Sequence, residues 1–300
     1  MTKLVFLSLG LFAISGVAQQ PDQPPPAVPA SQPAQPQAVV PQTQTPPPKD
    51  PAIIEDGGFQ FEPIYWFNEK QPELRGGKSA TTDGDIDYYG HAKRALGGEI
   101  GIPAGRANTL RISYFRVQGN TNGIAPAALD VFGEAYSAGD YLTANYLLQV
   151  AKISWDYLSY TWHKPSAEIR VKTLYELQYV NIGTNTLAPL VPITTDASGN
   201  TDTNSSSGSA NLILPTLGMG LESALGRHFR WEVKASGFII PHHGEIYDAQ
   251  AEIAWRAGPV EVVGGERAFH FKTSPQADQY FTDTLGGEYV GVRYYWGQQK

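Results

Sequence analysis

The sequence predicts an all-β protein, an antiparallel transmembrane β-barrel of about ten strands that follows a disordered Pro/Gln-rich segment. Three observations support this prediction. Apolar and polar residues alternate with a period of two over long segments, Tyr and Trp recur near the ends of those segments, and long connections alternate with short ones. Side chains of a strand point alternately to its two faces, so each such segment has one apolar and one polar side.

The composition excludes several other classes of protein. The chain has no Cys, which removes disulfide scaffolds, Cys-ligated zinc and thiol catalysis. Its formal net charge of −7 disfavours a nucleic-acid binder, which needs a basic surface. After the N-terminus it has no apolar run of about 18 residues, so a helical membrane bundle is excluded as well.

The alternation is clearest in the second half of the chain. In residues 228–240, Phe229, Trp231 and Val233 lie on one face and Arg230 and Glu232 on the other. The remaining strands are expected at 57–68, 93–103, 108–118, 141–162, 167–180, 209–224, 245–257, 259–272 and 289–296. This pattern gives about ten strands, and eight or twelve remain alternatives.

One expected strand contains an irregularity. In residues 259–272, Val260 and Val262 alternate in one phase, whereas Phe269 and Phe271 alternate in the other. Gly264 and Gly265 lie between the two pairs. Because glycines inside a strand often mark a bulge, the sequence predicts a register shift at this point.

The N-terminus has the features of an export signal. Lys3 precedes an apolar run, and Gly16 and Ala18 place small residues at a cleavage site, so residues 1–18 are expected to be a signal peptide. Residues 19–50 hold eleven of the 23 prolines and are expected to form a disordered tether in the periplasm, with a periplasmic or cell-wall protein as a conceivable partner. The barrel is expected over residues 51–300.

Two architectures fit the alternation. A soluble sandwich or a periplasmic ligand-binding barrel buries its apolar face, whereas a transmembrane barrel turns that face to the lipid and keeps charges inside. Strand length, terminal aromatic residues and the alternating connections favour the membrane barrel. The expected long connections are 69–92, 119–140, 182–208 and 273–285. The connection at 241–244 is an exception, since strict alternation puts it on the outer side although it is short.

The last strand carries a more specific pattern. Tyr289, Gly291, Tyr294 and Trp296 match the signal by which outer-membrane β-barrel proteins are recognised for assembly, although four more residues follow Trp296. Over residues 55–300 the chain therefore resembles this class of cell-envelope proteins of Gram-negative bacteria. The resemblance implies a location in the outer membrane, contact with outer-membrane lipid and insertion by the barrel-assembly machinery.

The polar faces of the expected strands point into the lumen. The sequence therefore predicts a lumen lined by charges of both signs, which either pair with one another as filling or line a narrow water path. The predicted lumen residues are Glu99, Arg111, Arg170, Lys172, Glu222, Arg230, Glu232, Lys234, Glu252, Arg256 and Arg293.

No catalytic residue, metal site or cofactor is predicted. His242, His243, Glu245 and Ser236 are close in sequence but match no specific catalytic or zinc motif. Two further groups are weaker still, namely the pair Ser159 and His163 and the acidic cluster Asp83, Asp85 and Asp87, which offers too few ligands for calcium.

The sequence thus predicts an outer-membrane barrel with a structural or surface-interaction role and no enzymatic activity. A narrow channel for small solutes is the main alternative, and a lipid-modifying outer-membrane enzyme is a less favoured one.

Overall fold

The structure is a computed structural model, and it describes residues 58–67, 92–104, 108–164, 167–195, 201–202, 204–226, 228–274 and 280–297. The predicted signal peptide, the tether and the acidic cluster at 83–87 lie outside these residues. Nearly all of the predicted loop 69–92 does as well.

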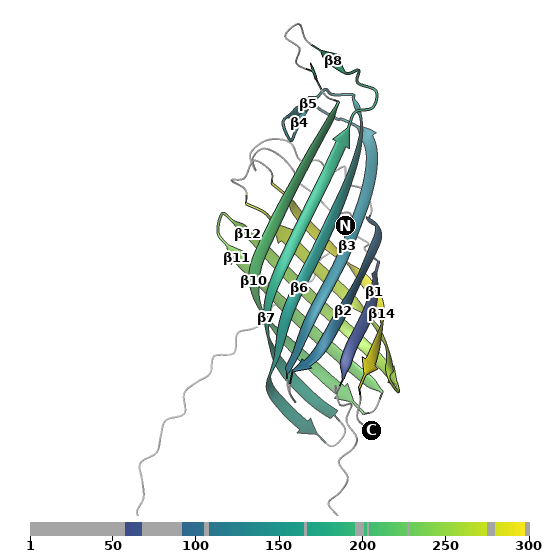
Figure 1. Cartoon of the computed structure of the whole chain (residues 1–300), viewed down its shortest axis with the longest axis vertical. Coiled ribbons are helices and arrows are strands. Elements are labelled where there is room, and N and C mark those ends of the chain that lie inside the picture. Colours follow the sequence, from purple (N-terminus) through teal and green to yellow (C-terminus); the bar gives the residue numbers. More distant parts are fainter. Residues whose placement is uncertain are drawn as a thin grey trace, which may run out of the picture. The chain divides into compact units, whose positions relative to one another are not determined.

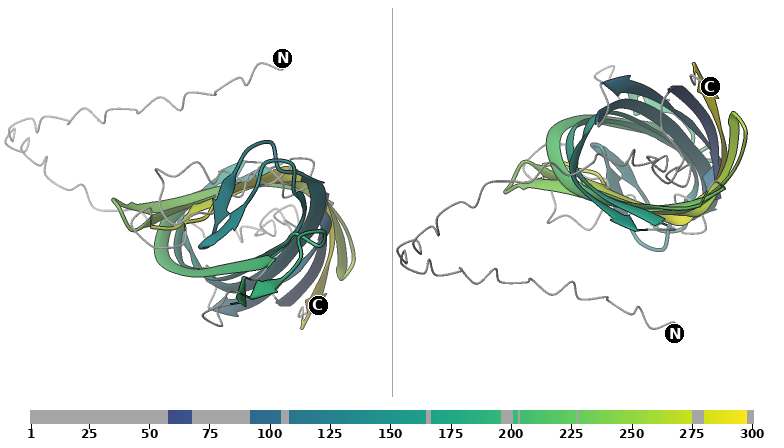
Figure 2. Two further views of the ribbon diagram at one scale, coloured as in Figure 1. Left: turned by 90° about the horizontal axis from the view of Figure 1, so that it is seen from above. Right: turned by 90° about the horizontal axis from the view of Figure 1, so that it is seen from below.

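Ten antiparallel strands form a closed barrel. Figures 1 and 2 show how the strands surround the lumen. The fold class and the strand number expected from the sequence are confirmed. Along the chain the barrel strands are β1 (Phe59–Trp66), β2 (Ala92–Ala104), β3 (Asn108–Ile124), β6 (Tyr141–Lys164), β7 (Ala167–Leu187), β10 (Ser205–Leu225), β11 (Phe229–Ile240), β12 (Gly244–Ala257), β13 (Val260–Lys272) and β14 (Thr282–Trp296).

The first and last strands close the barrel. Phe59 of β1 lies opposite Trp296 of β14, and Tyr65 lies opposite Val290. β1 also pairs with β2, so every barrel strand has two hydrogen-bonded neighbours. Closure removes the exposed sheet edges, whose unpaired backbone groups could not be satisfied in lipid.

The two faces of the wall are inverted relative to a soluble barrel. The outer surface exposes large apolar side chains such as Leu217, Met219 and Ile253, and Trp155, Trp255 and Trp296 lie towards the end with the short turns. The inward positions of the same strands bury charged residues, among them Glu232 and Arg293. This arrangement is that of an outer-membrane β-barrel. The described residues include no helix of the length and apolarity that crossing a bilayer requires.

Four strands are longer than expected. β3 continues to Ile124, β7 to Leu187, and β10 begins at Ser205, so the loops predicted at 119–140 and 182–208 are partly wrong. β14 likewise begins at Thr282, inside the predicted loop 273–285. In β3, β7 and β10 the outward residues of these extensions are mostly Asn, Ser and Gly. The apolar half of the alternation is therefore largely lost, although the backbone pairing continues.

Two short hairpins lie in the connections. β4 (Leu129–Val131) pairs with β5 (Glu134–Tyr136), and β8 (Thr194–Thr195) pairs with β9 (Thr201–Asp202). The β11–β12 connection at 241–243 is a short turn on the same side as these hairpins.

The predicted bulge at Gly264 and Gly265 is wrong. β13 pairs with β12 and with β14 in unbroken register through both glycines. Val262 faces outward and Phe269 inward in one continuous alternation. The apparent change of phase arises because the lumen is charged near Val262 and apolar near Phe269. Register shifts are present between Leu158 and Tyr160 and between Ala92 and Arg94.

Candidate functional site: the barrel lumen

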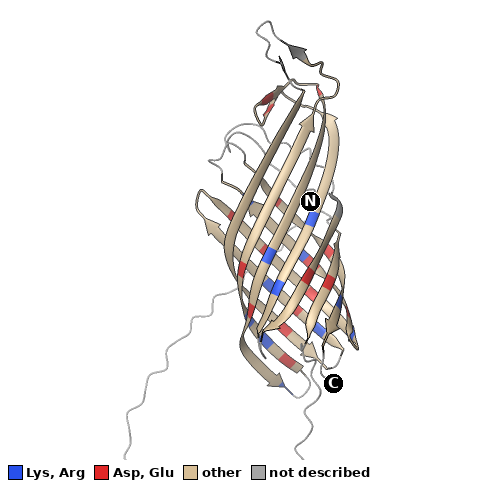
Figure 3. Ribbon diagram, in the orientation of Figure 1, with Lys and Arg blue, Asp and Glu red and all other residues tan. Residues whose placement is uncertain are grey.

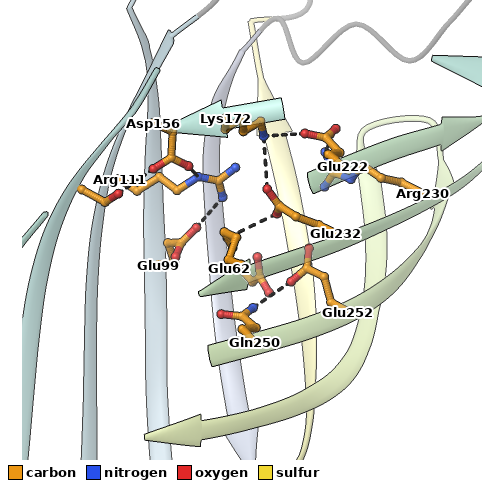
Figure 4. A network of polar contacts seen from close by, with 12 residues as sticks. Glu62, Glu99, Arg111, Asp156, Lys172, Glu222, Arg230, Glu232, Gln250 and Glu252 are labelled. Atoms are coloured by element: carbon orange, nitrogen blue, oxygen red, sulfur yellow. Dashed lines mark hydrogen bonds and ion pairs between the residues drawn. The ribbon is translucent and has the colours of Figure 1, made fainter. Parts of the chain in front are cut away.

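Charged side chains fill the half of the lumen nearer the short turns (Figures 3 and 4). We refer to them as the lumen network. The structure places all eleven predicted lumen residues on inward positions, and ten of them form ion pairs with one another or with further inward residues. These ten are Glu99, Arg111, Arg170, Lys172, Glu222, Arg230, Glu232, Lys234, Glu252 and Arg293.

Arg293 of β14 contacts three buried carboxylates. Its Nε donates to Glu62 at 2.5 Å, its Nη2 to Glu252 at 3.0 Å and its Nη1 to Glu261 at 3.0 Å. The guanidinium group is suited to this geometry because its donors form a fixed planar fork. Arg293 is 1% exposed, so these three carboxylates are its compensation for lost hydration.

A second group connects β7, β10 and β11. The Nζ of Lys172 pairs with Glu222 and lies 3.2 Å from Glu232, which also accepts from Lys234 at 3.2 Å. Arg230 lies 3.6 Å from Glu222 and 2.7 Å from Glu261. Since Glu261 also contacts Arg293, the two groups form one continuous set of contacts.

A third group lies on β2, β3 and β6. Arg111 donates to Glu99 at 2.5 Å and to Asp156 at 2.7 Å, and the hydroxyl of Ser154 donates to the other oxygen of Asp156. At the short-turn end, Arg170 pairs with Glu168 at 2.5 Å.

Arg256 does not join the lumen network. Its guanidinium lies over the ring of Tyr295, 3.9 Å from the ring centroid, and its Nε donates to the carbonyl of Gly258. Arg256 is buried and has no ion pair with the described residues. A cation over an aromatic face replaces the expected carboxylate here.

Several members of the lumen network were not predicted from the sequence. They lie at inward positions of the same strands, so the alternation of inward and outward residues contains enough information to identify them. These residues are Glu62, Lys152, Asp156, Glu168, Glu176, Asp248, Glu261 and Arg267. Among them, Lys152 lies 2.9 Å from Asp248, and Asp248 accepts two hydrogen bonds from Arg267.

An apolar layer fills the half of the lumen nearer the long connections, and the sequence did not predict it. The ring centroids of Trp66 and Phe115 are 5.5 Å apart, and those of Phe115 and Phe269 are 5.2 Å apart. Arg267 joins the two layers, because its guanidinium lies 4.5 Å from the centroid of Phe115 while it pairs with Asp248.

The β4–β5 hairpin covers this apolar layer. Val131 is fully buried, and the ring of Phe132 stacks on Phe281 of the β13–β14 connection at 5.6 Å between centroids. On the other side, the hydroxyl of Tyr136 donates to Ser206 of β10 at 3.0 Å. The hairpin therefore contacts two different parts of the barrel mouth. Burial raises the pKa of Tyr136 above its ordinary value.

A small cavity lies inside the barrel where the two layers meet. Its volume is about 20 Å³, and Trp66, Glu99, Phe115, Lys152 and Arg267 are among the residues that line it. A volume of this size admits about one water molecule. Among the described residues, ion-paired side chains occupy one half of the lumen and apolar side chains the other.

Changing Tyr136 to Phe tests how firmly the hairpin is held. In Y136F we expect the free energy that holds the hairpin against the barrel to fall by about 1 kcal/mol, because a buried hydrogen bond of the hydroxyl is lost while the ring remains. The measurement is the rate of limited proteolysis between β3 and β6, which should rise several-fold. Tyr141→Phe is the control, since no hydrogen bond of its hydroxyl is present among the described residues. Equal rates for Y136F and the unmodified protein would contradict the expectation.

The residues of the assembly-signal pattern lie on both faces of β14. Tyr294 and Trp296 point outward, and their rings are 4.5 Å apart. Tyr289 is buried inside and donates to Glu252 at 2.8 Å. Gly291 faces inward, where an added Cβ would lie 2.9 Å from Glu62 Oε1. The glycine therefore makes room for the carboxylate that Arg293 binds.

The residues considered for catalysis are not brought together. Ser236 faces the lumen and donates to Glu176 at 2.5 Å, whereas His242 and His243 lie in the β11–β12 turn. Glu245 contacts His270. Ser159 contacts Thr173, and His163 lies 3.7 Å from Glu168. No group of three or more metal-binding side chains occurs among the described residues.

Comparison with known proteins gives no family. No known protein family and no curated protein matches the chain. Among solved structures, the outer membrane protease OmpT from Escherichia coli is 8% identical, with 82% of this chain and 98% of that chain covered and a TM-score of 0.43. The outer-membrane expressed OmpT of Vibrio cholerae is 7% identical, with 81% and 100% covered and a TM-score of 0.21. Similarity at this level does not indicate an activity for this chain.

Proposed function

We propose that the protein is a non-enzymatic outer-membrane barrel with a structural or surface-interaction role and a closed lumen. The observation that carries the proposal is that two layers of side chains fill the lumen. An ion-paired layer around Arg293 lies below an apolar layer around Phe115, and the β4–β5 hairpin covers the second layer. A solute path would have to break both layers.

The polar side chains of the lumen support the same proposal. A catalytic group needs a geometry in which a nucleophile or base can reach a substrate. Here the hydroxyl of Ser236 and the amide of Gln178 both contact Glu176, and Glu232 contacts two lysines. These side chains contact one another, as expected of groups that hold the wall together.

The positions of the first and last barrel strands support a proposal for the segment that precedes the barrel. Phe59 lies opposite Trp296, at the end of the barrel where the short turns are. Short turns of such barrels face the periplasm. We therefore propose that residues 19–50 form a periplasmic tether and that a periplasmic or cell-wall component is their partner. The barrel-assembly machinery is proposed to insert the barrel.

Conductance measurements test the closed lumen. In planar bilayers we expect the purified protein to give no regular current steps, because ion-paired side chains fill one half of the lumen and apolar side chains fill the other. The barrel should be checked beforehand by comparing the gel mobility of boiled and unboiled protein. Regular steps whose size changes in E232Q or R293Q would support the narrow channel instead and overturn the proposal.

A further inference from the structure

The outer wall of four strands carries an uncharged polar surface above its apolar part. The inward neighbours of these residues are buried, so the residues themselves point away from the barrel. Figure 3 shows the upper parts of these strands almost free of charged residues, and Arg116 is the charged residue that borders the surface. We call this surface the amide face, and its polar residues are Gln118, Asn120, Asn122, Thr143, Asn145, Gln149, Asn181, Asn185, Ser205, Ser207, Ser209 and Asn211. Leu147 lies among them on β6, and Ile124 and Leu187 are exposed at the upper ends of β3 and β7.

The register brings its carboxamides side by side. Asn120 of β3 lies opposite Asn145 of β6, which lies opposite Asn185 of β7. Side chains at directly opposite positions are about 5 Å apart at Cβ. None of these three carboxamides has a hydrogen bond to another residue of the structure described here. They form a row of donors and acceptors that is open to the solvent.

A hollow lies along this row. Its volume is about 560 Å³, and Gln118, Asn120, Asn145, Gly183 and Asn185 are among the residues that line it. Gly183 leaves space in the wall, because a Cβ added there would meet nothing within 4 Å. A second hollow of about 370 Å³ is lined in part by the neighbouring Asn122 and Thr143.

Part of the surface is held in place by contacts within it. Asn211 accepts hydrogen bonds from Asn181 at 2.6 Å and from the hydroxyl of Tyr179 at 2.9 Å. Gln149 donates to the hydroxyl of Tyr114 at 2.8 Å. These contacts fix the orientation of the lower amides, so less side-chain freedom is lost when a ligand binds.

The chemistry of the amide face fits a saccharide. A carboxamide both donates and accepts, and so does a hydroxyl group, so a row of carboxamides can pair with the neighbouring hydroxyls of a sugar. A surface with a single cation at its border has little electrostatic attraction for a highly charged ligand.

The position of the face indicates where the saccharide comes from. In β7 the outward residues Tyr175, Leu177 and Tyr179 lead directly to Asn181, and in β10 Ile213 leads to Asn211. The amide face thus continues the lipid-facing surface on the side of the long connections. We propose that it binds the saccharide headgroup of a glycolipid whose acyl chains lie against the apolar surface below. This inference rests on the proposed surface-interaction role and names its partner.

The test measures binding of a fluorescently labelled uncharged glycolipid, a digalactosyl diacylglycerol, to the full-length protein in phosphatidylcholine nanodiscs. The test variant is N120A/N145A/N185A, and the control is E266Q/E288Q, which changes two exposed residues that face each other on β13 and β14. We expect the triple variant to bind about tenfold more weakly, since several hydrogen bonds are lost at an exposed site. The control should bind like the unmodified protein, and the free saccharide should compete.

Two results would overturn the inference. One is equal affinity of the triple variant, and the other is competition by the sugar-free lipid as strong as that by the whole glycolipid. Folding of each variant is checked by its heat-dependent gel mobility, and N145A alone replaces the triple variant if that one does not fold. Conductance is recorded separately, so failure of the closed-lumen proposal would be visible as current steps and not as lost glycolipid binding.

Discussion

Replacing Arg293 with leucine is expected to destabilise the barrel by about 3–5 kcal/mol, since it leaves the buried carboxylates of Glu62 and Glu252 without the cation that pairs with them. Glu62, Glu252 and Glu261 converge on this guanidinium, and each is at most 3% exposed. When the cation of such a group is removed, the buried carboxylates repel one another, and no water lies between them to weaken the repulsion. The measurement is the urea midpoint of the refolded protein, which should fall sharply.

The control for this prediction is Arg116→Leu. Arg116 is exposed, and it donates one long hydrogen bond to Gln118 at 3.4 Å. Its loss should change stability by no more than about 0.5 kcal/mol, as is usual for surface substitutions. Arg293→Lys should fall between the two, because lysine keeps the charge but lacks the planar fork that reaches three carboxylates. An unchanged urea midpoint for R293L would show that the carboxylates are stabilised in some other way.

The position of Arg293 also explains why the effect should reach assembly. Arg293 belongs to the last strand and Glu62 to the first, so their contact spans the seam at which the barrel closes. Gly291 lies two residues earlier and provides the space that Glu62 occupies. Part of the assembly-signal pattern in the sequence therefore has a structural role in the finished barrel, in addition to any role in recognition.

The sequence was informative wherever one face of a strand meets lipid and the other meets charge. In β11, Trp231 and Val233 alternate with Arg230 and Glu232, and this contrast defines both the strand and its inward face. In the upper part of β7 the contrast is lost, because Asn185 points outward and Ile182 inward. There the outward residues face water and the inward residues pack in an apolar interior. The sequence of this part therefore resembles an irregular polar segment.

The apolar layer could not be predicted for a similar reason. In the sequence, Phe269 and Phe271 are out of phase with Val260 and Val262, and the predicted bulge at Gly264 and Gly265 would bring all four onto one apolar face. Hydrophobicity alone does not distinguish lipid from a packed interior. The distinction required the strand register, which places Phe269 against Phe115 and below the β4–β5 hairpin. The choice of partners inside the lumen, such as Tyr295 for Arg256, also depends on the register.

Replacing Gly218 with alanine is expected to impair folding far more than the same change at Gly220. Both glycines face the lumen on β10, two residues apart. A Cβ at Gly218 would lie 2.4 Å from the carbonyl oxygen of Ala235 and 2.8 Å from the Cα of Ser236. At Gly220 the nearest atom is Cγ of Lys234 at 3.4 Å, which is ordinary contact with a flexible side chain.

The difference between the two positions reflects the curvature of the wall. At Gly218 the neighbouring strand β11 comes so close that only the absence of a side chain permits the pairing of Gly218 with Ser236. Backbone atoms cannot move away without breaking the hydrogen bonds of the barrel, so G218A should cost about 3 kcal/mol or prevent closure. G220A should stay within about 1 kcal/mol of the unmodified protein and can be stabilising, because alanine has less conformational freedom in the unfolded chain.

The two alanine variants can be compared by the fraction of protein that shows heat-dependent gel mobility after refolding, followed by urea titration of the folded fraction. If the close approach of β11 is the reason why position 218 requires glycine, the folded fraction should drop for G218A alone. Equal behaviour of the two variants would mean that the wall at β10 and β11 can relax by several tenths of an ångström. The wall would then be more deformable than the unbroken register of β10 and β11 implies.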